Sequence, residues 1–475
     1  MNSTVRQIAI DCGGRLAGDG DRAVKSIYND TRKPEKGGVY LAIVGPVHNG
    51  NLFCGAAAEQ GCVAVIVGEG SEIEFPEGYE DTPVIYVRDP RQAYLDIARA
   101  NRKRQNGLKV IAVTGSAGKT TTKEMIAKIV SAKFKTVKTE GNLNNAVGLP
   151  YIVCRIDETT EAAVIEMGMS GKGEIDVLAS VITPDICVIT NIGQAHIERL
   201  GSRHNIFLAK LEVADHMAPG SVLVLNGDDT ELNSDECRKM LEERGIRPVY
   251  FGINKNGVNS YRAENIEYVG DNGEMTGRYD LITPDGRAEV KLFSASNPIV
   301  YDSLAAVAAA VEAGVPLDEA VKSLEDYTLP PMRLQKIAVD GVTVIVDCYN
   351  SNPQSAQAAV EELRKTKASG RRIAVIGDML ELGTFTEQSH RVLGSYIAHN
   401  DIDILYTIGD GSRFAADAAR NAGMKEVYEF GPEDKSGLAV SLNRTLMPGD
   451  VVLFKASRGM RFENIVNDTF RRNIV

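Results

Sequence analysis

The chain has 475 residues, of which 43% are hydrophobic and 25% are charged, and this composition excludes a disordered or fibrous protein. Its formal net charge of −11 argues against general binding to nucleic acid or anionic membranes, which need broad basic surfaces. The seven scattered cysteines indicate reduced thiols rather than a disulfide framework, and no apolar run reaches the roughly 20 residues of a membrane span. We therefore expect a soluble cytoplasmic protein of several domains, with no inserted membrane segment.

Short strand and helix patterns fill the first hundred residues. Strands are predicted at Val39–Ile43 and Val63–Val67, and a helix pattern between them runs from Asn51 to Gly61. A polar, basic stretch from Asn101 to Gly107 is interpreted as a linker. We place the first domain boundary there, so that the first domain comprises residues 1–105.

From Lys109 onward, apolar strands alternate with helices, a pattern typical of a parallel sheet covered on both faces. After the first strand, further strands are predicted at 162–165, 186–189 and 221–225. Residues 255–295 suggest a few antiparallel strands, and an alanine-rich helix is predicted from Ser303 to Gly314. The double proline at 330–331 ends this second domain, residues 106–329.

A second series of alternating strands and helices follows the double proline. Its strands are predicted at 342–346, 372–376, 404–408 and 451–454. The pattern predicts a third α/β domain of residues 330–475.

The strongest functional signal lies in residues 110–126, where an apolar strand leads into a glycine loop and then a helix. The two glycines of the loop would let backbone amides close around phosphate oxygens, and the helix N-terminus adds a favourable dipole. Lys119 would neutralise phosphate charge and the Thr120 hydroxyl would hold Mg²⁺. A glycine turn beside a solvated lysine explains the strand, loop and helix context less well, although the glycine spacing departs from the usual G-x-x-x-x-G-K-[ST] loop. We expect ATP to bind at Gly115, Ser116, Ala117, Gly118, Lys119, Thr120 and Thr121.

Three further polar residues are ambiguous when considered alone. Glu166 directly follows a predicted strand and could complete a Mg²⁺ shell at the sheet edge, but a surface glutamate fits equally well. His196 is by itself more typical of a structural histidine, and Lys210 of a solvated helix lysine.

The form Thr-Gly-x-x-Gly-Lys-Thr resembles the ATP loop of the Mur ligase and folylpolyglutamate synthase superfamily, and 119–125 is similar to one branch of the Mur ligases. Further matching segments occur in order at 141–150, 166–168, 173–175, 191–198, 347–353, 377–383 and 457–463. The resemblance covers nearly the whole chain and is looser in the first hundred residues.

This resemblance implies an α/β fold of three domains. A central P-loop domain with a parallel sheet would be flanked by an N-terminal uridine-nucleotide-binding domain and by a C-terminal Rossmann-like domain that binds the amine substrate. The implied activity is an ATP-dependent ligase that joins D-alanyl-D-alanine to a UDP-N-acetylmuramoyl tripeptide through an acyl phosphate, releasing ADP and phosphate during peptidoglycan precursor synthesis. Alternatives are a related ligase for another acid and amine, or a nucleotide-binding paralogue without turnover. A monomer is expected.

The resemblance also implies roles for individual residues. His196 would help to hold a second magnesium ion, Lys210 would be carbamylated by CO₂ and become an anionic metal ligand, and Arg333 would reach the γ-phosphate. The ATP ribose would contact Asp347. UDP-substrate contacts are expected from Asp30, Thr31, Arg32, Asn142 and Asn144, although helix capping and turn stabilisation are alternatives for these residues. Amine-substrate contacts are expected from Tyr349, Asn350 and Ser457.

The stretch 294–306 departs from the usual family sequence. Ile299 and Asp302 occupy two positions that are usually asparagine, so we expect Asn297 to supply the adenine contact instead. Ala146 and the segment 49–51 also differ from the usual residues. The residues expected to carry catalysis are all retained.

Overall fold

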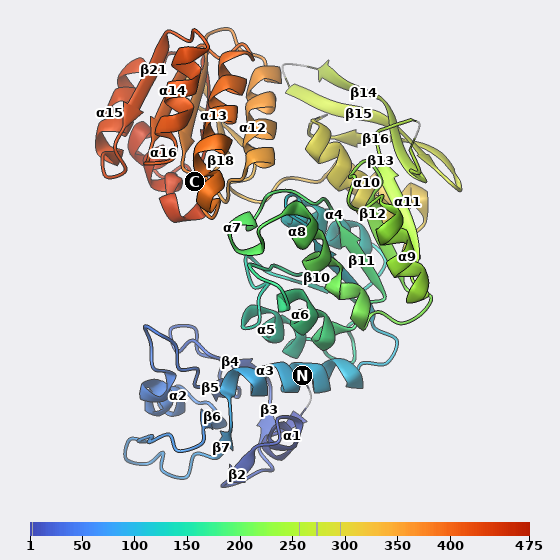
Figure 1. Cartoon of the computed structure of the whole chain (residues 1–475). Helices are drawn as coiled ribbons and strands as arrows, with labels where there is room; N and C mark the ends of the chain where they lie inside the picture. The colour runs from blue at the N-terminus through green and yellow to red at the C-terminus, as the bar shows by residue number, and fades with distance from the viewer. Residues whose placement is uncertain (2, 256, 272–273, 295) are drawn as a thin grey trace.

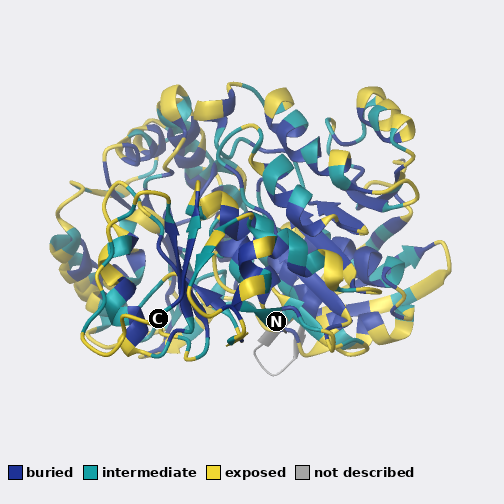
Figure 2. Cartoon of the chain, turned by 90° about the horizontal axis from the view of Figure 1, so that it is seen from below, coloured by how far each residue is buried: buried dark blue, intermediate teal, exposed yellow. Residues whose placement is uncertain are grey.

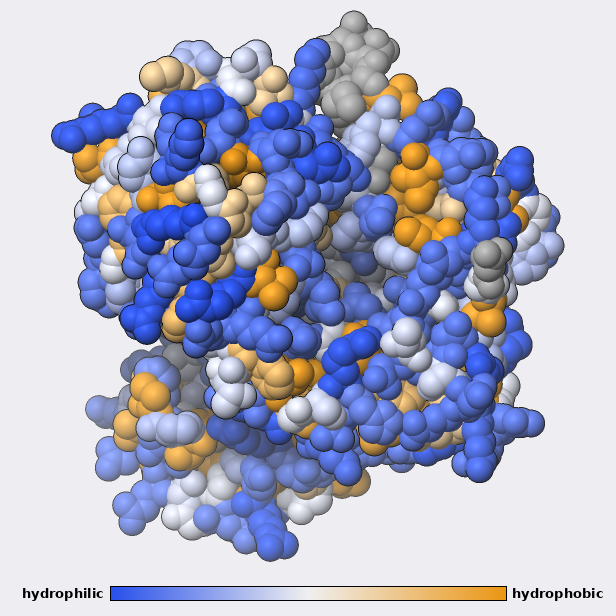
Figure 3. All heavy atoms as spheres, turned by 45° about the horizontal axis from the view of Figure 1, so that its top comes forward, coloured by the Kyte–Doolittle hydropathy of each residue, from blue (hydrophilic) through white to orange (hydrophobic). Residues whose placement is uncertain are grey.

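The computed structural model describes the chain except for residues 2, 256, 272, 273 and 295, and its strands form three large sheets (Figure 1). We call the parts built around these sheets the N-terminal, central and C-terminal units. Buried residues fill the strands and the inner sides of the helices, while exposed residues cover the outside (Figure 2). Hydrophilic residues predominate on the face in Figure 3, and apolar ones form small scattered groups. Within the described residues, no helix combines the length and apolar character needed to cross a membrane.

The N-terminal unit contains a small mixed sheet. Its strands are β1 (Ser3–Thr4), β2 (Arg15–Ala17), β3 (Ala23–Val24), β4 (Ile27–Tyr28), β5 (Val39–Leu41), β6 (Ala64–Gly68) and β7 (Val84–Val87). Its helices are α1 (Val5–Asp11), η1 (Gly50–Phe53), α2 (Cys54–Glu59) and α3 (Pro90–Arg104). The sheet order is β2-β7-β6-β5-β4, with only the β2–β7 pair antiparallel, and β1 pairs separately with β3. Two predicted strands and the helix between them are confirmed here.

The predicted linker from Asn101 is wrong in its first half, because α3 continues to Arg104. Asn101 is buried, and its side-chain amide donates hydrogen bonds to the carbonyl oxygens of Val153 and Ile156. Residues 101–104 therefore form the last turn of α3, which packs against the central unit, and do not form a solvated linker.

The central unit contains the largest sheet. Its strands are β8 (Lys109–Thr114), β9 (Thr136–Lys138), β10 (Ala162–Glu166), β11 (Ile186–Ile189), β12 (Val222–Asn226), β13 (Arg247–Gly252), β14 (Tyr261–Asp271), β15 (Glu274–Thr283) and β16 (Gly286–Leu292). Its helices are α4 (Lys119–Val130), α5 (Gly148–Cys154), α6 (Glu174–Ile182), α7 (Ile197–Leu200), α8 (Arg203–Leu211), η2 (Glu212–His216), α9 (Asp235–Glu243), α10 (Asn297–Glu312) and α11 (Leu317–Glu325).

The order of this sheet brings three strand ends together. It reads β16-β15-β14-β13-β12-β11-β8-β10-β9, parallel from β14 to β9 and antiparallel among β14, β15 and β16, as predicted for this region. Strand β8 lies between β11 and β10, so the residues that follow these three strands meet at one edge. In open α/β sheets, ligands bind at this carboxyl edge.

The C-terminal unit is a second α/β layer structure. Its strands are β17 (Gln335–Val339), β18 (Val342–Asp347), β19 (Arg372–Gly377), β20 (Ile404–Ile408), β21 (Glu426–Phe430) and β22 (Val451–Lys455). Its helices are α12 (Pro353–Lys365), η3 (Gly383–Phe385), α13 (Thr386–Ala398), α14 (Arg413–Asn421), α15 (Lys435–Thr445), η4 (Arg458–Met460) and α16 (Phe462–Phe470). The order β17-β18-β22-β19-β20-β21 is parallel except for β17, and all four predicted strands are present.

Candidate active site

The glycine loop connects the end of β8 to the start of α4. Gly115 and Gly118 both have left-handed backbone conformations, with φ of 146° and 82°. A Cβ atom at Gly118 would come within 2.2 Å of Asp302 Oδ1, and one at Gly115 within 1.9 Å of Thr190 Oγ1. Conformation and space therefore both require glycine at these two positions, and the loop leads its amides into the first turn of α4.

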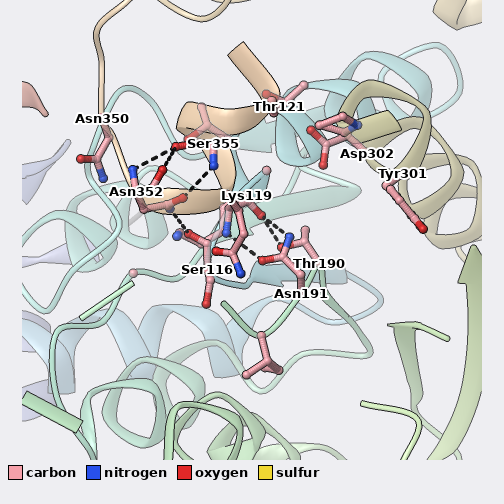
Figure 4. A pocket seen from close by; sticks show the side chains of 18 of the residues that line it. Ser116, Lys119, Thr121, Thr190, Asn191, Tyr301, Asp302, Asn350, Asn352 and Ser355 are labelled. Atoms are coloured by element: carbon pink, nitrogen blue, oxygen red, sulfur yellow. Dashed lines mark hydrogen bonds between the residues drawn. The ribbon is translucent and has the colours of Figure 1, made fainter. Parts of the chain in front are cut away.

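Two residues after β11 hold the loop in place (Figure 4). Asn191 accepts a hydrogen bond from the Ala117 amide at 3.0 Å and donates one to the Ala117 carbonyl at 3.1 Å. The hydroxyl of Thr190 donates to the same carbonyl at 2.6 Å. Because the side chains bind both polar groups of Ala117, the loop backbone is fixed before any ligand arrives.

Lys119 begins α4, and its ammonium group donates to the Gly115 carbonyl at 2.8 Å. Burial lowers the pKa of this amine, and the nearby carboxylate of Glu166 partly opposes that shift. The lysine thus folds back over the loop, in position to meet an anion bound there.

A cavity of about 930 Å³ lies over the carboxyl edge of the central sheet and extends to the C-terminal unit. Most of the predicted site residues line it together. They are Ser116, Ala117, Gly118, Lys119, Thr120, Thr121, Asn142, Asn144, Glu166, His196, Arg333, Asp347, Tyr349 and Asn350. Residues scattered over more than 200 positions of the chain thus meet in one space.

Glu166 ends strand β10 and is only 2% exposed. Its Oε1 accepts a hydrogen bond from the Asn144 amide at 2.8 Å. Its Oε2 is buried and has no hydrogen-bond partner among the described residues. An unpaired carboxylate oxygen in a buried site is costly unless a cation or donor satisfies it, so this atom fits a metal ligand.

His196 and Lys210 lie close to Lys119 in the same region. Burial lowers the pKa of His196, the carboxylate of Glu381 opposes this shift, and the charges of Lys119 and Lys210 add to it. Burial also lowers the pKa of the Lys210 amine well below its usual range. Lys210 is 2% exposed on α8, and the described residues offer it no hydrogen bond or ion pair.

Among the described residues, no group of three or more His, Cys, Asp and Glu side chains is gathered closely enough to hold a metal ion. Glu166 and His196 alone therefore do not make a complete metal site from unmodified side chains. A cation in this cavity needs further oxygen ligands, which a hydroxyl, a modified lysine or a bound phosphate would supply.

The C-terminal unit contributes a cation to the phosphate loop. Arg333 Nη2 lies 2.9 Å from the hydroxyl of Thr120, and its guanidinium group lies 4.4 Å from the centre of the Tyr349 ring. Asp347 pairs with the buried Lys455 at 2.8 Å. Arg333 therefore lies beside the phosphate loop, while its contact with a γ-phosphate stays a prediction.

Several predicted site residues lie outside the cavity. Asp30, Thr31 and Arg32 follow β4 in the N-terminal unit, where Asp30 pairs with Arg32 at 2.8 Å in a turn rather than at a helix start. Ser457 accepts a hydrogen bond from the Leu380 amide at 2.9 Å and is 3% exposed. Its hydroxyl is thus occupied within the unit.

The expected adenine contact at Asn297 is not supported by its position. Asn297 is exposed at the start of α10 and does not line the cavity. The helix begins six residues earlier than predicted, and its next turn directs Ile299 and Asp302 to the cavity instead.

Asp302 is 6% exposed, and its Oδ1 accepts a hydrogen bond from Thr122 at 3.0 Å. Burial raises its pKa to about 8, with the Thr122 hydrogen bond and Arg333 acting against the shift. At neutral pH this carboxyl group is therefore largely protonated, and it resembles the asparagine amide in charge.

Sequence reasoning missed several residues that build the site. Asn191 and Glu381 fall within segments that matched the family, and Asn352 donates to the Ser116 carbonyl at 3.4 Å from the C-terminal unit. Asn191 lies two residues after a predicted strand, which was a usable signal. The contact of Glu381 with His196 had no local signal, because the two residues are 185 positions apart.

Known proteins match this architecture over its whole length. The family model for the Mur ligase middle domain matches residues 113–310, and the model for the Mur ligase, glutamate ligase domain matches residues 332–458. UDP-N-acetylmuramoyl-tripeptide–D-alanyl-D-alanine ligase from Bacillus subtilis is 34% identical over 98% of both chains. The enzyme of that name from Escherichia coli is 30% identical, also over 98% of both.

Two solved structures give the same result. A crystal structure of MurF from Acinetobacter baumannii matches with a TM-score of 0.88 and 30% identity over 99% of each chain. MurF ligase from Thermotoga maritima in complex with ADP matches with a TM-score of 0.78 and 26% identity, over 94% of this chain and 97% of that one. The fold and cavity define a three-part α/β protein with a nucleotide-binding phosphate loop. The chain belongs to the Mur ligase family, which confirms the resemblance and the fold class predicted from the sequence.

Proposed function

We propose that this protein is an ATP-dependent ligase that joins D-alanyl-D-alanine to a UDP-N-acetylmuramoyl tripeptide in peptidoglycan precursor synthesis. Full-length similarity to ligases of that name supports the substrates. The single observation that carries the chemistry is the meeting of Lys119, Glu166 and Arg333 in one cavity. These groups are the ones that phosphoryl transfer to a carboxylate requires.

The three units correspond to three domains with separate tasks, with boundaries at 1–105, 106–329 and 330–475. The first domain binds the uridine nucleotide through Asp30, Thr31 and Arg32. The central domain binds ATP, and the third presents the amine substrate near Tyr349 and Asn350. Asn142 and Asn144, which line the cavity, extend the substrate site toward the phosphate loop.

The carboxylate of the tripeptide is a poor electrophile because it lacks a good leaving group. Transfer of the γ-phosphoryl group of ATP converts it into an acyl phosphate, and ADP leaves. The neutral amine of the dipeptide then attacks the acyl carbon and forms the C–N bond. The acyl C–O bond breaks, phosphate departs with its electrons, and the nitrogen loses one proton to solvent. Lys119 and Arg333, which both line the cavity, stabilise the negative charge of the transferring group.

Magnesium ions would be held by Thr120, Glu166, His196 and a carbamylated Lys210, with two sites in all. When bound, the ions neutralise phosphate charge and polarise the transferring group. Glu166 fits this role because its Oε2 is buried and lacks a partner among the described residues. The Thr120 hydroxyl now accepts from Arg333, so it is within reach of groups that approach the loop.

Carbamylation of Lys210 would remove a buried positive charge and would create an anionic metal ligand. A buried ammonium group without a counterion is unstable, and the lowered pKa of Lys210 favours the neutral amine. The neutral amine attacks CO₂, forms a C–N bond and releases one proton, which leaves an anionic carbamate with two oxygen ligands. This group would add anionic oxygen ligands to those of Glu166 and so help to complete the metal site.

The enzyme acts in the cytoplasm as a monomer, where ATP and the nucleotide-linked tripeptide are both available. The decisive experiment measures phosphate release by the purified full chain with ATP, Mg²⁺ and UDP-N-acetylmuramoyl tripeptide, with and without D-alanyl-D-alanine. Stoichiometric phosphate and amide product only when both substrates are present support the proposal. Equal release with another acid or amine would assign a different ligase, and no release with any acceptor would indicate a protein without turnover.

A further inference from the structure

The segment 377–383 matched the family in sequence, yet the reaction described so far uses none of its residues. It follows strand β19 at the carboxyl edge of the C-terminal sheet. The Met379 amide donates to His390 Nε2 at 3.0 Å, and the Leu380 amide donates to Ser457 Oγ at 2.9 Å. Met379 and Leu382 are each 1% exposed. The segment is thus firmly anchored on both sides of Glu381, whose own side chain is 64% exposed.

Glu381 spans the gap to the central unit. Its Oε2 lies 2.7 Å from Nδ1 of His196, and both residues line the cavity. The contact has support around it, because η3 packs against α7, the helix that His196 precedes. Gly383 approaches so closely that a Cβ atom there would come within 2.7 Å of the Glu198 side chain. The two residues therefore meet within a docked surface.

Stability alone does not explain this pair. An ion pair with one largely exposed partner contributes about 0–1 kcal/mol to folding. Orientation is the stronger effect, because a carboxylate on one ring nitrogen fixes the histidine tautomer and leaves the other nitrogen for a ligand. Histidines that bind metal ions usually have such a carboxylate or carbonyl partner on the second nitrogen.

We propose that Glu381 is a positioning residue, which holds the Nδ1–H tautomer of His196 so that Nε2 is available to bind magnesium. This inference rests on the proposed metal role of His196. Because the two residues belong to different units, the geometry of His196 depends on the docking of the C-terminal unit. Metal binding at His196 is thereby coupled to docking of the C-terminal unit, which presents the amine substrate.

The test is a Mn²⁺ titration followed by electron paramagnetic resonance, using the full chain with the non-hydrolysable analogue AMP-PNP. The variants are E381A, E381Q and H196A, and E387A is the matched control. Glu387 is an exposed glutamate on α13 that pairs with Arg391 at 2.8 Å, in the same unit but away from the cavity. The site lost in H196A identifies the ion of interest.

We expect E381A to weaken Mn²⁺ binding at that site about 10- to 100-fold, the usual effect of removing such a partner. E381Q should recover part of the loss because its amide oxygen still accepts from Nδ1–H. E387A should bind like the wild type. If H196A lost the ion but E381A bound Mn²⁺ as tightly as E387A, the inference about Glu381 would be overturned. Unchanged binding in H196A would instead refute the proposed metal role of His196, and the role of Glu381 with it.

Discussion

The guanidinium group of Arg333 lies 2.9 Å from the Thr120 hydroxyl, although 213 positions of chain separate the two residues. Thr120 belongs to the first turn of α4, and Arg333 lies just before β17 in the C-terminal unit. The contact brings a planar cation to the mouth of the phosphate loop. Charge on a transferring phosphoryl group would develop at this point.

Substitution of Arg333 by alanine should lower kcat about 100- to 1000-fold, because a preorganised donor to the transferring group is lost. The Kd for ATP should change far less, since Lys119 and the loop amides remain. R333K should recover only part of the rate because lysine lacks the planar fork. Phosphate-release kinetics and nucleotide binding by calorimetry measure both effects.

The control for this experiment is R413A, which removes an exposed arginine from α14 in the same unit. A loss of ATP affinity in R333A as large as its loss of kcat would contradict the assigned role. It would make Arg333 a ground-state binding residue.

Asn191 should be important for ATP binding even without touching the nucleotide. N191A removes two hydrogen bonds to Ala117, each worth about 1 kcal/mol, so the Kd for ATP should rise about tenfold or more. N191D should be worse, because it loses the donor and adds a negative charge near the phosphates. Calorimetric titration with AMP-PNP measures the change. The control N421A, at an exposed position of α14, should bind AMP-PNP like the wild type. Normal binding by N191A would show that the loop keeps its conformation without Asn191.

The phosphate loop could be predicted from the sequence because its determinants are local. A strand, two glycines, a lysine and a helix start lie within about ten residues, and the backbone conformations they imply are present. The strand order was not predictable at the same level. The strand order depends on which helices cover which face of the sheet. Because β10 and β11 both pair with β8, Glu166 and Asn191 lie beside the loop.

Contacts between units were the least accessible to sequence reasoning. Glu381 and His196 come together because η3 packs against α7, and no local sequence pattern predicts this contact. The error in the predicted start of α10 has a different cause. Pro298 can occupy the first turn of a helix, so α10 began before the predicted serine and turned Asn297 to solvent.

Carbamylation of Lys210 can be detected directly. With ¹³C-labelled bicarbonate, the wild-type protein should give a carbamate ¹³C resonance that is absent in K210R, because the guanidinium group does not form a carbamate. Burial lowers the pKa of Lys210, which favours the reactive neutral amine relative to an exposed lysine. K210R should also lose about 100-fold or more in kcat if a metal ligand is removed. The exposed Lys239 offers a control in K239R, and a persistent resonance in K210R would assign the carbamate elsewhere.

Asp302 should make stability depend on pH in an unusual direction for a carboxyl group. Its pKa is raised to about 8 in the folded chain, whereas an unfolded aspartate has a pKa near its usual low value. Between these values the folded state binds the additional proton. The free energy of unfolding should therefore fall as pH rises, by about 2 kcal/mol between pH 6 and pH 8 from this group alone.

D302N should remove this contribution, because the amide does not ionise yet still accepts from Thr122. Its stability relative to the wild type should therefore increase from pH 6 to pH 8, as measured by urea unfolding followed by circular dichroism. The exposed Asp326 provides the matched control, since D326N removes a charge from the same unit without relieving a buried acid. Parallel pH profiles for the wild type and D302N would mean that Asp302 is already ionised at pH 6, held so by Arg333 and Thr122.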